Sequence, residues 1–202
     1  MNNAIDAFRI SMDHARHLGG LHDALSSLTT SAVDASDLLR AQLVLGVSAL
    51  DYFVHEITVL GMVAVFEGRR PSTPAFLKYR VAMDSIRSGI MGYAWFESDI
   101  RERNSFLSFQ QPDKIADAIR LFSNVKLWQQ VALQLSMPEQ DIKNRLKLIV
   151  DRRNKIAHEA DADPSFPNMR WPITKSDVDQ SLTYIAQICE SIYVAVQDSK
   201  AQ

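Results

Sequence analysis

The sequence is poor in the residues that build disulfide-bonded or turn-rich folds. Cys189 is the one cysteine among 202 residues, which excludes an intramolecular disulfide and a zinc site built from cysteines. Seven glycines and seven prolines are few for this length, and they favour long helices over a β fold with many turns. Without a disulfide to form, the chain fits a reducing, cytoplasmic environment.

The chain also lacks a strong charge of either sign. Its 22 lysines and arginines nearly balance its 24 aspartates and glutamates, so the formal net charge is -2. The overall charge gives no reason to expect binding to nucleic acid. Such a role would require a local patch of basic side chains.

Long uninterrupted apolar runs are missing as well. The first eighteen residues include Asp6 and Asp13, where a signal peptide needs an apolar run. The most apolar stretch, residues 41–66, is broken by Asp51 and Glu56, which a membrane span rarely holds near its centre. We therefore expect a soluble protein without a membrane span, in which residues 41–66 belong to a buried core helix.

Hydrophobic periodicity and helix-capping residues predict an all-α protein. The expected helices cover residues 3–18 (stopped by Gly19-Gly20), about 34–67, 75–88, 112–121, 124–136 and 139–158, with a further piece at 96–108 and a final helix after Thr174. Thr174 and Asp177 form a capping-box pattern at the start of that final helix. We expect one domain over residues 1–202: a helical bundle with its core at about 35–196, a helical extension at 1–30 and short helices in the middle.

One position breaks the apolar stripe of the helix expected at 139–158. The stripe consists of Ile142, Leu146, Ile149 and Ile156. Arg153 takes the place of the missing apolar member, so its side chain points along the face that should be buried. A buried guanidinium needs a carboxylate, a phosphate or a water-filled cleft. Asp51 and Glu56 on the central helix are the available carboxylates.

The same helix concentrates basic residues. Between residues 143 and 155 they are Lys143, Arg145, Lys147, Arg152, Arg153 and Lys155, against the single acid Asp151. Such a patch suits a polyanion. The alternative is a solvated helix face, since basic side chains are favoured toward the carboxyl end of a helix.

Arg153 and His158 do not share a face of a regular helix. At about 100° per residue they lie about 140° apart, whereas Asn154 and His158 are four residues apart and lie on one face. Two copies of this segment related by a two-fold axis could bring both arginines and both histidines to one cleft. A site built from these residues would therefore require a dimer.

The run RRNKIAH at residues 152–158 resembles the signature of the HEPN superfamily, an arginine and a histidine separated by four to six residues, with a polar residue after the arginine. Three further segments agree: residues 48–53, 108–115 and 171–178. Together they are similar to the branch called RiboL-PSP-HEPN. The likeness spans residues 35–196, and position 160 is alanine where one toxin-like branch carries a tyrosine.

The resemblance implies a helical HEPN bundle that cleaves RNA without a metal or another cofactor, possessing a composite site in a homodimer. The implied catalytic residues are Arg153, His158 and Asn154, with Arg152 and Lys155 binding RNA. Independently of the resemblance, Asp51 on the central helix could support the site as the ion-pair partner that orients Arg153. It also implies a toxin or phage-defence role, with an antitoxin or a nucleotidyltransferase-like protein as partner.

Two other interpretations stay open at this point. The chain could be a non-catalytic HEPN module that binds RNA, a nucleotide or a protein partner, or a plain helical scaffold in which RRNKIAH only ends a helix. Glu159, Asp161 and Asp163 weaken the ribonuclease interpretation, since they follow His158 closely and would repel RNA unless the chain turns away.

Overall fold

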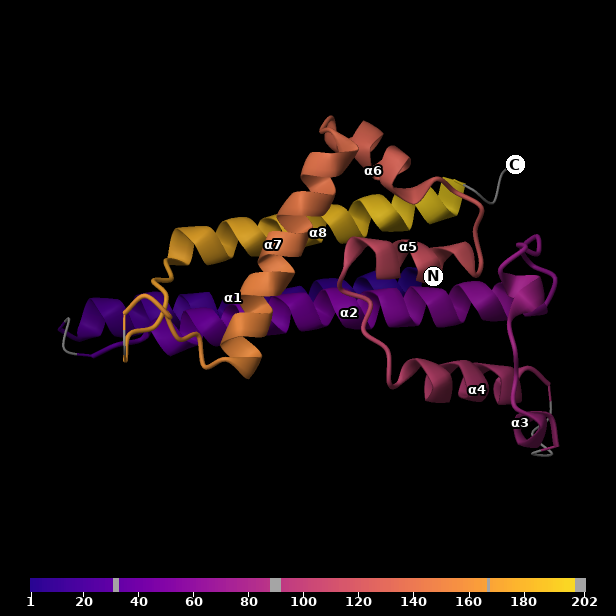
Figure 1. Cartoon of the computed structure of the whole chain (residues 1–202), viewed down its shortest axis with the longest axis horizontal. Coiled ribbons are helices and arrows are strands. Elements are labelled where there is room, and N and C mark those ends of the chain that lie inside the picture. The colour runs from indigo at the N-terminus through magenta and orange to yellow at the C-terminus, as the bar shows by residue number, and fades with distance from the viewer. Residues whose placement is uncertain (31–32, 88–91, 167, 199–202) are drawn as a thin grey trace.

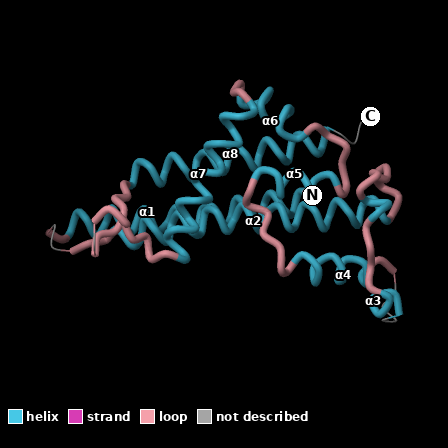
Figure 2. The backbone as a smooth tube through the Cα atoms, viewed as in Figure 1, coloured by secondary structure: helices cyan, strands magenta, loops and turns pink. Residues whose placement is uncertain are grey.

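The computed structural model describes residues 1–30, 33–87, 92–166 and 168–198. Its helices are α1 (Asn2–Leu28), α2 (Ser36–Phe66), the 3₁₀ turn η1 (Phe76–Lys78), α3 (Met83–Arg87), α4 (Ala94–Asn104), α5 (Pro112–Arg120), α6 (Leu127–Leu135), α7 (Glu139–His158) and α8 (Lys175–Asp198). Within these ranges there is no strand, as Figure 2 shows, and the all-α prediction with short helices in the middle is confirmed.

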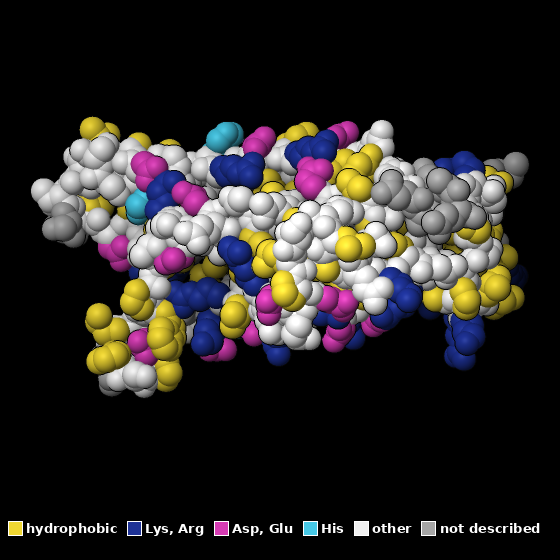
Figure 3. All heavy atoms as spheres, turned by 90° about the horizontal axis from the view of Figure 1, so that it is seen from above, with side chains coloured by type: hydrophobic (Ala, Val, Ile, Leu, Met, Phe, Trp, Pro, Cys, Tyr) yellow, Lys and Arg dark blue, Asp and Glu magenta, His cyan; other side chains and the backbone are white. Residues whose placement is uncertain are grey.

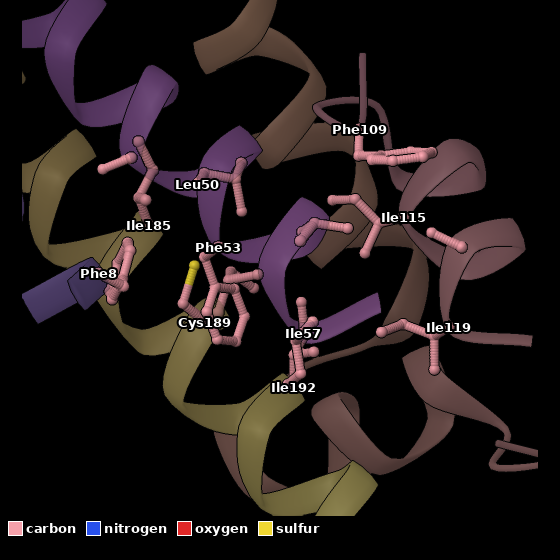
Figure 4. Packing of buried hydrophobic residues seen from close by; sticks show 14 of the residues in the cluster. Phe8, Leu50, Phe53, Ile57, Phe109, Ile115, Ile119, Ile185, Cys189 and Ile192 are labelled. Atoms are coloured by element: carbon pink, nitrogen blue, oxygen red, sulfur yellow. The ribbon is translucent and has the colours of Figure 1, made fainter. Parts of the chain in front are cut away.

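Helix α2 is the central element of the bundle. Its side chains are apolar nearly all round, and α1, α8 and α7 pack against it (Figure 1). Figure 4 shows Phe53 and Ile57 of α2 packed among Phe8 of α1 and Ile192 of α8. By length and composition α2 could cross a membrane, but 56% of its most apolar window is buried inside the protein. Its apolar character is therefore explained by its place in the core.

Helix α1 continues through Gly19-Gly20, so the prediction that it stops there is wrong. Gly19 is buried where α1 meets α2, and a Cβ at this position would lie 2.9 Å from Oε1 of Gln42. The side-chain amide of Gln42 thus occupies the space beside Gly19, and the packing of the long apolar face of α1 outweighs the low helix propensity of the glycine pair.

The middle of the chain differs from the sequence prediction in one place. The helix expected at 75–88 is instead a 3₁₀ turn, an extended stretch and the short helix α3, while Ser88 lies outside the described residues. Asp99 of α4 explains the break, because its carboxylate accepts the backbone N–H of Ala82 at 3.1 Å and the hydroxyl of Ser85 at 2.9 Å. The helix expected at 96–108 is present as α4, and those at 112–121 and 124–136 as α5 and α6.

Helix α7 crosses α2 and α8 steeply, and its carboxyl end reaches past α2 (Figure 1). The chain then turns back and enters α8 at Thr174, whose hydroxyl oxygen accepts the backbone N–H of Asp177 at 3.2 Å. The hydroxyl also donates to the Asp177 carboxylate at 2.5 Å. Thr174 therefore caps α8 as predicted, with the carboxylate of the expected capping box bound to the hydroxyl rather than to a backbone N–H. This arrangement places the RRNKIAH segment at one edge of the bundle.

Candidate functional site

Arg153 lies on the buried face of α7, where the apolar stripe predicts it. Ile142 and Leu146 of that stripe are fully buried, and Ile156 is packed against the core. The Arg153 side chain is half-buried at the end of the row. The helix therefore carries a cation on the side that faces the protein.

The Arg153 guanidinium is only partly satisfied within the chain. Its NH1 donates to Oδ1 of Asn154 at 3.1 Å, and its buried Nε has no hydrogen-bond partner among the described residues. A buried donor without a partner costs about 1–3 kcal/mol, and more when the group is charged. The site can lower its free energy by taking up an anion beside Arg153.

His158 is the final residue of α7 and is exposed. The helix continues without a break between Arg153 and His158, so their side chains leave the axis about 140° apart. Asn154 lies about 40° from His158 around the same helix. The side-chain oxygen of Asn154 accepts a hydrogen bond from the Arg153 guanidinium. The polar side chains of α7 therefore run along its carboxyl end from Arg153 through Asn154 to His158.

Asp51 does not form the ion pair with Arg153 that the sequence suggests. Its carboxylate accepts the backbone N–H of Phe109 at 2.6 Å and the side-chain amide of Gln110 at 2.9 Å. The ring of His55 adds a contact at 3.7 Å. Asp51 thus holds the segment before α5 on α2, and no ion pair joins it to Arg153 among the residues that the structure describes.

Glu56, the other carboxylate expected near Arg153, is also engaged elsewhere. It forms an ion pair with Arg101 of α4 through both of its oxygens. Glu56 is therefore bound to α4, and Asp51 is bound to the segment before α5. Arg153 consequently stays available to an anion from outside this chain.

Arg152 has a structural place that the sequence does not indicate. Its guanidinium forms an ion pair with Asp161 and donates to the backbone oxygens of Trp171 and Pro172, each at 3.2 Å. Burial lowers the pKa of Arg152 against the opposing effect of Asp161. This side chain is therefore engaged by acceptors of its own chain, whereas Arg153 has an unpaired Nε among the described residues.

The acidic residues after His158 turn away from the surface. Ala160 and Asp161 adopt left-handed conformations with φ of 52° and 57°, which reverse the chain. Asp161 is 1% exposed and Asp163 is 8% exposed, which leaves Glu159 as the exposed acid of the three. The repulsion expected between these acids and RNA is thereby largely removed.

Lys155 stays on the surface beside the same loop. Its ammonium lies 5.2 Å from the centre of the Trp171 ring, within the range of a cation–π contact. Near the end of α7, the cations that form no ion pair among the described residues are thus the exposed Lys155 and the half-buried Arg153.

The basic run of α7 does not form one continuous patch. Lys143 pairs with Glu139, and the Arg145 guanidinium lies 4.3 Å from the centre of the Tyr184 ring. With Arg152 also engaged internally, the solvated-face interpretation fits the first part of the run. On the face seen in Figure 3, basic and acidic side chains lie interspersed.

Arg40 is a residue of this region that the sequence analysis missed. Arg40 of α2 is 7% exposed and binds Asp161, although the apolar periodicity of α2 does not single it out. A lone arginine in an apolar helix is the signal that could have indicated it.

Among the described residues, no group of three or more histidine, cysteine, aspartate or glutamate side chains is placed to hold a metal ion.

An α-helical bundle with an arginine, an asparagine and a histidine along the end of a crossing helix defines the HEPN type of protein. The family model described as RiboL-PSP-HEPN matches residues 14–198, and the chain belongs to this family. The match begins within α1, further toward the amino end than the motifs alone indicate. Comparisons with curated proteins and with solved structures gave no match.

Proposed function

We propose that this HEPN protein is a metal-independent endoribonuclease whose site is built from the α7 ends of two copies of the chain. The observation that carries the proposal is the half-buried Arg153, with an unpartnered Nε, on the same helix end as His158. An RNA phosphate would supply the missing acceptor. Lys155 would add a second phosphate contact, while Arg152 is left out because Asp161 engages it.

The reaction uses only proton transfer and phosphate stabilisation. An imidazole changes protonation near neutral pH, so a histidine can accept the proton of a ribose 2′-hydroxyl. The 2′ oxygen then forms a bond to the adjacent phosphorus while the bond from phosphorus to the 5′ oxygen breaks. The leaving 5′ oxygen takes a proton from water, and the protonated histidine returns its proton to the solvent. The products are a 2′,3′-cyclic phosphate and a 5′-hydroxyl.

Arg153 and Asn154 have distinct parts in this scheme. The Arg153 guanidinium can bind the phosphate with two N–H groups and stabilise the charge that develops during attack. Asn154 orients the guanidinium through the hydrogen bond to NH1. The angle of about 140° between Arg153 and His158 favours a composite site, in which one copy supplies the arginine and the other the histidine.

The inward turn of residues 160–163 supports an RNA substrate. It withdraws two of three carboxylates from the surface beside His158. We further propose that the protein acts in the cytoplasm, in a toxin or phage-defence system with a neutralising partner. The alternative is a non-catalytic HEPN module that binds RNA, a nucleotide or a protein.

The test is cleavage of labelled RNA in the presence of a metal chelator. The wild-type protein is compared with His158→Ala, Arg153→Ala and Lys147→Ala, an exposed α7 residue outside the proposed site. We expect wild type and Lys147→Ala to cleave RNA, and the cleavage rate of the two site variants to fall about 100-fold or more. RNA binding without cleavage by the wild type would favour the non-catalytic module, and equal cleavage in all samples would reveal a contaminant.

A further inference from the structure

Two arginines from different helices converge on one buried carboxylate beside the proposed site. Nε of Arg40 on α2 donates to Oδ2 of Asp161 at 2.7 Å, and NH2 of Arg152 on α7 donates to the same oxygen at 2.9 Å. Both arginines also donate to the backbone oxygen of Trp171, at 2.9 and 3.2 Å respectively. We name this group of Arg40, Arg152, Asp161 and the Trp171 carbonyl the Asp161 cluster.

The Asp161 cluster ties the end of α7 to the start of α2. Asp161 is 1% exposed and Arg40 is 7% exposed, so little solvent reaches the charges. Removing one partner of a buried ion pair leaves the other charge uncompensated. Asp161 is the carboxylate that both guanidinium groups share, while Asp37 lies 3.9 Å from Arg40, so the link between Arg40 and Arg152 depends on Asp161.

The backbone of Asp161 is held as firmly as its side chain. Its N–H donates to the Lys155 oxygen at 3.0 Å, and its own oxygen accepts the N–H of Trp171 at 2.9 Å. The left-handed φ at Asp161 follows a similar φ at Ala160, a conformation that alanine rarely adopts. Side-chain and backbone contacts together fix the chain immediately after His158.

We infer that Asp161 is a positioning residue for the proposed site: its buried carboxylate holds the carboxyl end of α7, and so His158, in place against α2. This inference rests on the proposed function for its catalytic consequence. Its structural consequence can be measured separately, because the orientation of His158 does not depend on turnover.

Asp163 provides a matched control in the same loop. It is also buried, but its carboxylate accepts the N–H of Ser165 at 2.9 Å, and its backbone N–H donates to Met169. These partners belong to the loop itself rather than to α2 or α7. Asp163→Asn therefore removes a buried charge from the loop without cutting its link to the helices.

The experiment compares wild type, Asp161→Asn and Asp163→Asn in RNA cleavage and in nuclear magnetic resonance of the His158 ring. For Asp161→Asn we expect kcat to fall about tenfold or more with KM nearly unchanged, and the His158 signals to shift. Asp163→Asn should keep kcat within about threefold and leave the His158 signals in place. Asp161→Glu, which retains the charge, should recover part of the lost kcat.

An unchanged kcat in folded Asp161→Asn, or a His158 ring that does not shift, would overturn the inference. So would equal effects of Asp161→Asn and Asp163→Asn. If the wild type cleaves no RNA, the proposed function fails, and the His158 signals alone decide the positioning role. If Asp161→Asn does not fold, Arg40→Lys replaces it, since it keeps the charge but loses the two-pronged contact with Asp161 and Trp171.

Discussion

Two glycines in long helices lead to opposite predictions for replacement by alanine. A Cβ at Gly61 in α2 would lie 2.3 Å from the ring of Phe122, which is itself buried. A Cβ at Gly20 in α1 would meet nothing within 4 Å. Gly61→Ala should therefore destabilise the protein by about 1–3 kcal/mol through overpacking. Gly20→Ala should stabilise it by about 0.5–1 kcal/mol through helix propensity.

Urea unfolding measures both effects. The midpoint should move down for Gly61→Ala and up for Gly20→Ala, with the slope unchanged. A Gly61→Ala protein as stable as the wild type would show that α2 and the segment after α5 are less closely packed than the structure has them.

Cys189 allows a second prediction for a single side chain. The thiol lies in the core, and burial raises its pKa well above the usual range. Since the thiolate is the reactive form, Ellman's reagent at mildly alkaline pH should react at least about a hundredfold more slowly with native protein than with urea-unfolded protein. Rapid reaction of the native protein would contradict the burial of this side chain.

Single residues of the site could be predicted only where the signal lies within one helix. Arg153 interrupts a stripe of regular spacing, so its place on the buried face followed from α7 alone. The hydrogen-bond partner of Asp51 could not be predicted from one helix, because Phe109 lies 58 residues away and is brought close by packing. The pairing of Arg152 with Asp161 depends on a left-handed turn that no local sequence rule demanded.

The start of α2 and the end of α7 were placed well from the sequence. Ser36 begins α2, with the carboxylate of Asp34 accepting its backbone N–H at 2.8 Å, and α7 ends at His158 as expected. The prediction failed where tertiary contacts opposed local propensity, at Gly19-Gly20 inside α1 and at Ala82 before α3. Both departures are long-range effects that sequence periodicity does not contain.

The capping box of α8 can be tested by replacing its threonine. Thr174→Ala removes the acceptor for the N–H of Asp177 and should lower the free energy of unfolding by about 1 kcal/mol. The matched control is Thr183→Ala, since the exposed Thr183 hydroxyl bonds only the Asp179 oxygen of its own helix. Thr183→Ala should change the free energy of unfolding by less than about 0.5 kcal/mol. Equal losses in both variants would exclude a special capping role.

The composite site is a property of the assembled molecule, and mixing two inactive variants tests it. Arg153→Ala retains His158, and His158→Ala retains Arg153. After subunit exchange of an equal mixture, about half of the subunits should sit in mixed dimers, each with one intact arginine and one intact histidine. We expect RNA cleavage to rise clearly above that of either variant alone.

A mixture that stays inactive after verified exchange would place the working arginine and histidine in a single subunit. The control mixes each variant with the double variant Arg153→Ala/His158→Ala. Neither of these mixtures can form a dimer that holds both an intact Arg153 and an intact His158, so both should remain inactive.

The order in which the helices leave the ribosome has a consequence for this fold. Apolar α2 is made early, but α8, which covers one of its sides, follows only after residue 174. A nascent chain that has reached α7 still exposes the apolar face of α2 that α8 later covers. A protein that stops at residue 174 should therefore collect in the insoluble fraction. Early stop codons in this message would thus yield aggregates rather than shortened, partly working molecules.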